Sequence, residues 1–171
     1  MGAFVIPADY CLALFDAHAY ASFVAPDWTL PQLRTHLVGE MGRGVIVVWG
    51  TGAPGNWRVE VTDGASGRKG HREFSSRVRA TGKRLHLTSY DELTAAAQFE
   101  DTRLPRSGTG GWAVTVVPGE YDCRVVQLYD PAAAESEAVF SQETPHFAVE
   151  LVPASGKGPR AARDIPWFPA G

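Results

Sequence analysis

The chain has 171 residues, of which 44% are hydrophobic and 20% are charged, as in an ordinary globular domain. Its formal net charge of −3 is too small for a tail that binds nucleic acid or for an acidic chaperone tail. No apolar run approaches the roughly 20 residues that span a bilayer, so a membrane protein is not expected. The 18 glycines and 12 prolines indicate many turns, which favours an all-β fold over a helical one.

The first part of the chain contains a predicted buried strand at residues 10–15 and a helix near residues 29–38. Apolar residues at helical spacing indicate the helix, with Thr29 as its N-cap and Pro31 in its first turn. Gly39 is the expected end of this helix.

Short strands dominate the rest of the chain. They are predicted from β-branched or alternating apolar residues at 44–49, 56–61, 71–80, 84–89, 112–117, 121–129 and 147–152. The glycine-rich loop at residues 50–55 and the turn at Pro118 and Gly119 are each expected to close a hairpin. Residues 90–99 form either a short helix or a bulged extension of a strand. The pattern predicts an all-β fold, a two-sheet antiparallel β-sandwich with one short helix near residues 29–38.

The composition changes near the C-terminus. We expect residues 1–153 to form the sandwich domain and residues 154–171 to form a linker and an apolar tail. The tail contains Trp167 and Phe168, which either dock on the domain or are exposed as a peptide ligand. Docking is favoured because an exposed Trp-Phe pair promotes aggregation.

The two cysteines, Cys11 and Cys123, each lie in an apolar, strand-like run. The first residues lack the pattern of a secretory signal, so we expect a cytoplasmic protein with two buried, reduced thiols. A disulfide between Cys11 and Cys123 remains an alternative if both side chains face one core.

Charges are unevenly distributed along the sequence. Residues 58–84 contain eight bases and three acids, residues 91–101 contain four acids and no base, and residues 120–150 contain seven acids and one base. Such a division steers a charged partner, or else it reflects two solvated faces of opposite sign.

No pattern in the sequence assembles an active site. The G-x-G-x-x-G match at residues 50–55 precedes a strand rather than the helix that a dinucleotide site requires. The five histidines and two cysteines lack metal-ligand spacing, and no G-x-S-x-G nucleophile motif occurs. The basic segment has one aromatic residue, Phe74, between Arg68 and Arg84, so no stacking platform for nucleic acid is expected. Arg77 and Arg79 share one face of their predicted strand, which leaves a weak phosphate-binding ridge as an alternative. We therefore expect a non-enzymatic protein with no cofactor, no metal and no direct contact with nucleic acid or membrane.

The order of elements resembles that of the bacterial competence-nuclease-inhibitor family and related immunity proteins of toxin systems. The resemblance rests on the early strand at 10–15, Asp27-Trp28-Thr29 at the start of a helix, Met41-Gly42, the strands near 45–49 and 57–61, the Val-Pro-Gly-Glu-Tyr sequence at 117–121, and a closing strand that ends Leu151-Val152-Pro153. This resemblance implies an inhibitor that covers the active site of a nuclease or toxin. The expected partner is a basic protein, since nucleases bind phosphate in basic grooves.

The residues expected to contact such a partner are acidic and aromatic, and most lie in predicted loops. They are Asp91, Glu92, Glu100, Asp101, Asp130, Glu135, Glu137 and Glu143, with Tyr90, Phe99 and Tyr129 as aromatic anchors. The alternative is a sandwich that binds a sugar or lipid in a cleft lined by Trp49, Trp57 and Trp112. The favoured interpretation, however, places these three tryptophans in the core.

Overall fold

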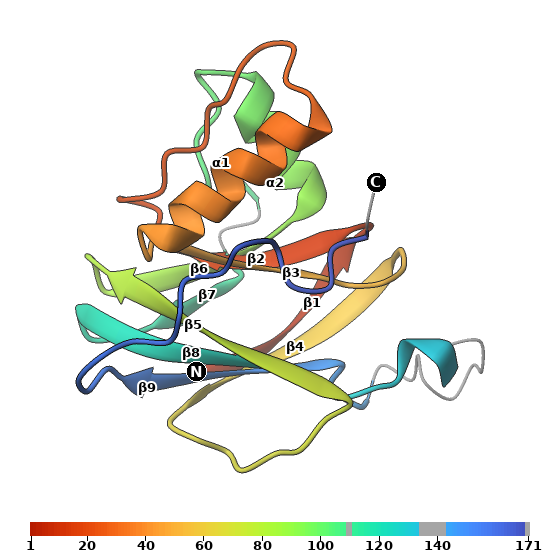
Figure 1. Ribbon diagram of the computed structural model, residues 1–171, viewed down its shortest axis with the longest axis vertical. Helices are drawn as coiled ribbons and strands as arrows, with labels where there is room; N and C mark the ends of the chain where they lie inside the picture. The colour runs from red at the N-terminus through yellow and green to blue at the C-terminus, as the bar shows by residue number, and fades with distance from the viewer. Residues whose placement is uncertain (109–110, 134–142, 170–171) are drawn as a thin grey trace.

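The computed structural model describes residues 1–108, 111–133 and 143–169, and within them the chain forms two packed β-sheets (Figure 1). The first sheet has five strands in the order β1 (Gly2–Ala8), β4 (Gly55–Asp63), β9 (Phe147–Pro153), β8 (Gly119–Gln127) and β5 (Arg72–Ala80). The second has four strands in the order β3 (Ile46–Gly50), β2 (Cys11–Phe15), β6 (Arg84–Ser89) and β7 (Ala113–Thr115). The predicted mostly-β, two-sheet fold is confirmed.

Both predicted hairpins are wrong, because the loops in question lead from one sheet to the other. The loop after Gly50 connects β3 of the four-stranded sheet with β4 of the five-stranded sheet, and Pro118 separates β7 from β8 in the same way. A turn sequence determines where the chain bends, but not which strand is paired afterwards. Among the described residues all strand pairings are antiparallel except that of β4 with β9, which is parallel.

The main core lies between the two sheets. Alternate residues of β4, Trp57, Val59 and Val61, point into it, as the apolar alternation in the sequence predicts. Trp49 and Trp57 are fully buried there, and the Trp57 ring stacks on that of Tyr129 at a centroid distance of 5.4 Å. The favoured interpretation of these two tryptophans as core residues is confirmed.

A helical layer covers the outer face of the four-stranded sheet (Figure 1). It consists of α1 (Leu30–Gly42) and α2 (Tyr90–Gln98), which pack on β2 and β3 together with Leu104 and Ile165. β2 and β3 are therefore buried on both faces, which explains their continuous apolar sequences. Neither helix in the described part of the chain is long and apolar enough to cross a membrane.

Helix α1 is longer than the sequence predicts. Thr29 and Gln32 form a capping box, with the Thr29 N–H donating to Gln32 Oε1 at 2.8 Å, so the predicted start is confirmed. The helix continues past Gly39 because Met41 extends the buried stripe. A positive φ of 70° at Gly44 follows the end of the helix.

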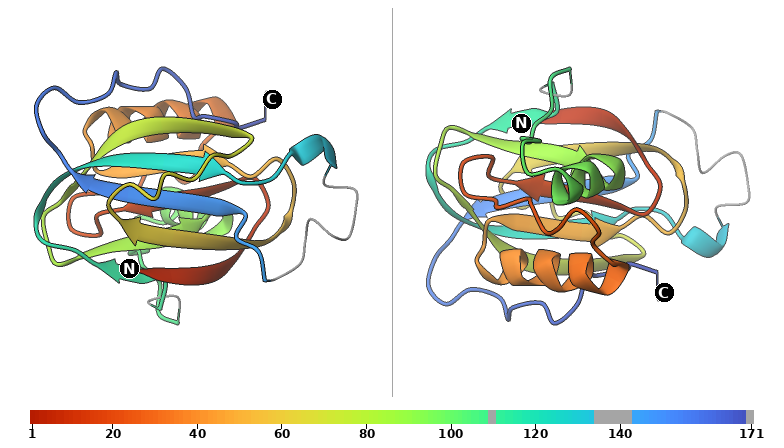
Figure 2. Two further views of the ribbon diagram at one scale, coloured as in Figure 1. Left: turned by 90° about the horizontal axis from the view of Figure 1, so that it is seen from below. Right: turned by 90° about the horizontal axis from the view of Figure 1, so that it is seen from above.

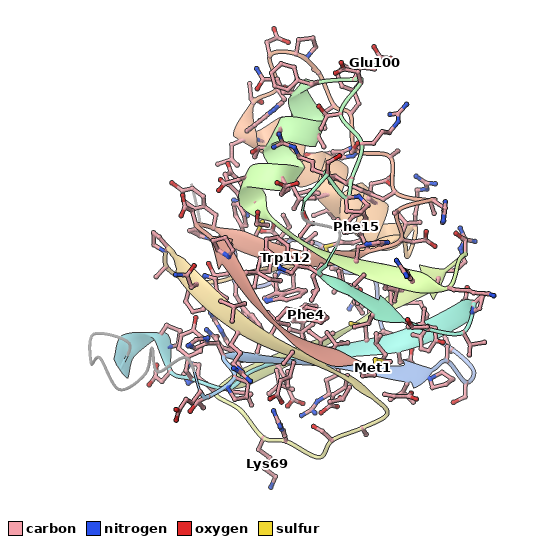
Figure 3. The ribbon with its side chains drawn as sticks, turned by 180° about the vertical axis from the view of Figure 1, so that it is seen from behind. Met1, Phe4, Phe15, Lys69, Glu100 and Trp112 are labelled. Atoms are coloured by element: carbon pink, nitrogen blue, oxygen red, sulfur yellow. The ribbon has the colours of Figure 1, made fainter. Side chains whose placement is uncertain are left out.

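Strand β1 was not expected from the sequence. Phe4, Ile6 and Ala8 alternate with more exposed residues, and the strand pairs with β4 along its whole length. Phe4 and Trp112 pack against the main core beside the edge strands β1 and β7 (Figure 3). Pro7 is tolerated here because β1 is an edge strand.

The C-terminal segment after β9 docks on the other side of the sandwich, along the edge strands β3 and β5 (Figures 1 and 2). The Gly50 N–H donates to the Pro166 carbonyl at 2.8 Å. The Trp167 ring packs edge-on against that of Phe74, 5.1 Å away, and Ile165 is buried beneath the helical layer. Docking, the favoured fate of the Trp-Phe pair, is confirmed.

The outer face of the five-stranded sheet carries a buried ion pair. Arg124 of β8 lies 2.9 Å from Glu150 of β9, and it also contacts Glu73 of β5. The loop from β4 to β5 crosses this face diagonally over β9 and β8 (Figure 2), and its Ser66 hydroxyl donates to Glu150. The Glu150 side chain, only 2% exposed, is thereby covered on the face that would otherwise meet water.

Both thiols are free and buried, as expected, and they lie in different cores. Cys11 faces the helical layer, whereas Cys123 faces the core between the sheets, so the alternative of a disulfide is wrong. Burial raises the pKa of Cys123 to about 12, and it raises the pKa of Cys11 well above its usual range.

We expect neither thiol to react in the native protein, because a buried, protonated thiol is a poor nucleophile. A colorimetric thiol reagent at pH 8 should label neither cysteine without denaturant and both in urea. Labelling of one thiol in the native protein at a rate close to that in urea would contradict the burial described above.

Candidate protein interface

Helix α2 and the three residues that follow it carry four of the predicted acidic contact residues, Asp91, Glu92, Glu100 and Asp101. Asp91 and Glu92 lie in the first turn of α2, where the partial positive charge of the helix N-terminus favours carboxylates. Asp91 is exposed, and Tyr90 packs against the rings of Tyr10, 4.8 Å away, and Phe168. The helix N-terminus accounts for the two carboxylates, and packing accounts for the Tyr90 ring, independently of any contact with a partner.

Glu92 is largely withdrawn from solvent. Its side chain is 15% exposed and lies 3.8 Å from the guanidinium of Arg106. Burial raises the pKa of Glu92 above its usual value, and the nearby charge of Arg106 only partly opposes that effect. Of the two acids in this turn, Asp91 is thus the more accessible.

The C-terminal end of α2 forms an exposed corner. Phe99, Glu100 and Asp101 are all exposed there, and 52% of the Phe99 surface is accessible. Phe23 and Pro26 belong to the loop between β2 and α1, and they lie beside these three residues. The Val24 N–H donates to the Ala97 carbonyl at 2.9 Å and holds this loop against the end of α2. We call Phe23, Pro26, Phe99, Glu100 and Asp101 the α2 corner.

Two hollows flank the α2 corner and share Phe23 and Glu100 as their common wall. One, of about 340 Å³, is mainly apolar and is lined by the corner residues and Gln98. The other, of about 400 Å³, is more polar and includes His18, Tyr20 and Arg103. Glu100 lies at the extremity of the helical layer (Figure 3). The corner thus offers an aromatic ring and two carboxylates beside concave surface.

The other predicted contact residues lie elsewhere. Asp130 and Glu143 are exposed at the ends of the loop between β8 and β9, away from the helical layer, and Asp130 lies 3.9 Å from His71. Tyr129 is buried and donates its hydroxyl to the Thr51 carbonyl at 2.6 Å, which argues against its role as an anchor. Glu135 and Glu137 fall outside the described residues. The described members of the predicted acidic set therefore fall into two separate groups.

The tryptophan-lined cleft of the alternative interpretation is contradicted. Trp49 and Trp57 are completely buried between the sheets, and Trp112 packs against the same core. The hollows described above are lined by other residues.

Asp16 and His18, which lie two residues apart after β2, form a local structural unit held by backbone hydrogen bonds. The Asp16 carboxylate accepts hydrogen bonds from the backbone N–H groups of His18, at 2.8 Å, and Thr81. Although burial on its own would raise it, these hydrogen bonds lower the pKa of Asp16. Within the described residues, no group of three or more His, Cys, Asp and Glu side chains is placed to hold a metal ion.

Neither a family model nor a curated protein sequence matches the chain. Solved structures with the same fold include the protein described as crocagin biosynthetic gene J, with a TM-score of 0.61 and 17% identity over 90% of this chain and 96% of that one. They also include ComJ from Bacillus subtilis, an inhibitor of the DNA-degrading activity of NucA, with a TM-score of 0.53 and 10% identity over the same shares. At these identities the likeness concerns the fold, and the resemblance to the competence nuclease inhibitor expected from the sequence is confirmed at that level.

Proposed function

We propose that the protein is a non-enzymatic inhibitor that neutralises a nuclease or another toxin by covering its active site. One observation carries the proposal: an aromatic side chain, Phe99, is 52% exposed between an apolar hollow and the carboxylates of Glu100 and Asp101. Protein interfaces favour aromatic anchors, and the exposed Phe99 ring adjoins both an apolar hollow and two carboxylates. The fold shared with ComJ, itself a nuclease inhibitor, supports the same proposal.

The charge of the α2 corner indicates the kind of partner. A nuclease presents a groove of basic residues for phosphate, and carboxylates are suited to occupy that groove in place of the nucleic acid. Glu100 and Asp101 are exposed at the corner, and Asp27 and Asp91 are exposed on the same helical layer. In this proposal the partner is a basic protein, the acids accelerate association, and Phe99 slows dissociation. Binding takes place in the cytoplasm.

The first test is a pull-down of the tagged protein from a lysate of its own organism, at low and at high salt. The proposal requires one stoichiometric partner that is a nuclease or toxin and whose capture weakens as salt rises. A partner of another class, or no stoichiometric partner at either salt concentration, would contradict it.

With the partner in hand, charge reversal by Glu100→Lys and Asp101→Lys together should slow association at low salt by at least about tenfold. The matched control is Asp130→Lys with Glu143→Lys, which reverses two charges at the other acidic group. Stopped-flow association rates distinguish the two groups. A larger effect of the control variant would move the interface to the loop between β8 and β9.

Replacing Phe99 with alanine should raise the dissociation constant by about 30-fold, equivalent to about 2 kcal/mol, mainly through faster dissociation. The side chain is half-exposed in the free protein, so the free energy of unfolding should hardly change. Titration calorimetry with the captured partner measures the first quantity and urea denaturation the second. A variant that binds as tightly as the wild type would remove Phe99 from the interface.

A further inference from the structure

Four arginines from three distant parts of the chain converge on one small hollow of about 210 Å³. Arg43 follows α1, Arg77 and Arg79 lie on β5, and Arg160 belongs to the C-terminal segment. The end of α1, the end of β5 and the C-terminal segment meet on one side of the molecule in both Figure 1 and Figure 2. Sequence spacing places only Arg77 and Arg79 together, so this cluster is a product of the fold.

Two of the four guanidinium groups are already neutralised. Arg43 lies 2.6 Å from Glu40, and Arg77 lies 2.9 Å from Asp122 and 3.2 Å from Glu120. Arg79 and Arg160 are exposed, and neither forms an ion pair within the described part of the chain. Glu120 lines the hollow, lies opposite Arg79 in the strand register and contacts Arg77, so the four arginines exceed the carboxylates of Glu40, Glu120 and Asp122 by one positive charge.

The C-terminal segment fixes one of these four guanidinium groups in place. Its backbone at Gly158 lies against the guanidinium of Arg77, so closely that a Cβ atom there would be 2.8 Å from Cζ. Arg77 is therefore immobilised between this segment and its acidic partners, and Arg160 follows two residues later at the rim of the hollow. The Arg79 backbone is fixed as well, because its N–H donates to the Gly44 carbonyl at 2.7 Å. The Arg77 guanidinium therefore loses little side-chain entropy when an anion binds.

We infer that this hollow is a binding site for a phosphoryl group, either as free phosphate or at the end of a nucleotide. A tetrahedral phosphate accepts hydrogen bonds from guanidinium groups on several sides at once, whereas a planar carboxylate is satisfied by one bidentate fork. Arg79 and Arg160 supply the charge and Arg43 and Arg77 the wall. Glu120 also lines the hollow and limits its affinity for a dianion.

The site is independent of the proposed inhibitor function. Arg43 follows the last residue of α1, whereas the loop that carries Phe23 and Pro26 precedes its first residue, and a helix of 13 residues is about 20 Å long. A ligand in the hollow therefore leaves the α2 corner accessible, and failure of either proposal leaves the other untouched.

The test is a heteronuclear NMR titration of the full chain with inorganic phosphate, with adenosine monophosphate and with acetate, all at one ionic strength. We expect saturable shifts at residues around the hollow with phosphate or the nucleotide, and much weaker ones with acetate. Tighter binding of the nucleotide would identify a terminal phosphate as the ligand, and equal binding would identify the free ion. Absence of saturation with both phosphate compounds, or equally tight binding of acetate, would overturn the inference.

Variants provide the decisive comparison. Arg79→Gln with Arg160→Gln should weaken phosphate binding at least about tenfold, whereas Glu120→Gln should strengthen it severalfold because a repulsive charge is removed. Lys69→Gln is a control for net charge, since Lys69 is an exposed cation of the loop between β4 and β5 (Figure 3) that does not line the hollow. Equal loss in the control and the double variant would show a general effect of net charge and would overturn the site.

Discussion

Replacing Arg124 with methionine is expected to lower the free energy of unfolding by about 4 kcal/mol at pH 7. The loss of stability arises because the Glu150 carboxylate stays buried without its opposite charge. Glu150 is 1% exposed, and Arg124 is the cation that contacts it, at 2.9 and 3.0 Å through one guanidinium nitrogen. Without that cation, the buried carboxylate of Glu150 retains its hydrogen bonds with Ser66 but has lost its opposite charge, and the carboxylate of Glu73 also loses its partner. Urea denaturation followed by tryptophan fluorescence measures the difference.

The effect should depend on pH in a defined direction. Although burial would raise it, hydrogen bonds from Ser66 and Arg124 lower the pKa of Glu150 below its usual 4.5. A carboxyl group whose pKa is lowered by folding stabilises the protein above its unfolded pKa, and this stabilisation is lost as the pH falls through the folded value. The difference between wild type and the Arg124 variant should therefore shrink below about pH 4.5.

Two further variants separate the ion pair from other effects. Arg124→Met combined with Glu150→Gln should recover part of the stability lost in the single variant, because the second substitution removes the buried charge. Arg79→Met, at an exposed position of the same sheet, should change stability by less than about 0.5 kcal/mol. If the double variant were as unstable as the single one, the loss would come from packing rather than from the unpaired charge.

The parts of the fold that the sequence predicts well are those determined by local patterns. The capping box at Thr29 and the alternation along β4 each depend on neighbouring residues, and both appear as expected. Strand pairing depends on distant residues. The turns at Gly50 and Pro118 therefore indicate a change of direction correctly, while the sheet to which the next strand belongs is decided by the whole core.

The candidate interface was predictable in composition but not in arrangement. The acids at 91–101 stand out in the sequence, and the structure places Glu100 and Asp101 together beside Phe99. Phe23 and Pro26 were missed because their loop has no periodicity, and a backbone hydrogen bond to α2 brings them to the corner. Burial of Tyr129 was equally hidden, since an aromatic residue beside an acidic loop has the same sequence signature in a core and in an interface.

Removal of residues 154–171 should destabilise the protein by at least about 3 kcal/mol. The segment buries Ile165 in the core under the helical layer and covers the edge strands β3 and β5 with Trp167, whose ring also lies 4.7 Å from the guanidinium of Arg72. One guanidinium nitrogen of Arg34 in α1 donates to both carboxylate oxygens of its Asp164, at 2.8 and 2.9 Å. Cooperative unfolding of residues 1–153 alone would support the sandwich as an independent domain that the tail stabilises. A truncated chain as stable as the full one would show that the tail contributes nothing.

Replacing Gly50 with alanine, which adds one methyl group, should lower the stability nearly as much as removing residues 154–171. The Gly50→Ala Cβ would lie 2.0 Å from the Trp167 carbonyl oxygen and 2.7 Å from the Phe168 nitrogen, so the tail must move away from β3. We expect a cost of about 3 kcal/mol in the full chain, as for other overpacked sites. In the chain that ends at Pro153 the obstructing backbone is gone, and the same substitution should change stability by less than about 1 kcal/mol. Equal costs in the two backgrounds would mean that Gly50 is required by β3 itself. Unequal costs would show that this glycine is needed for the docked tail.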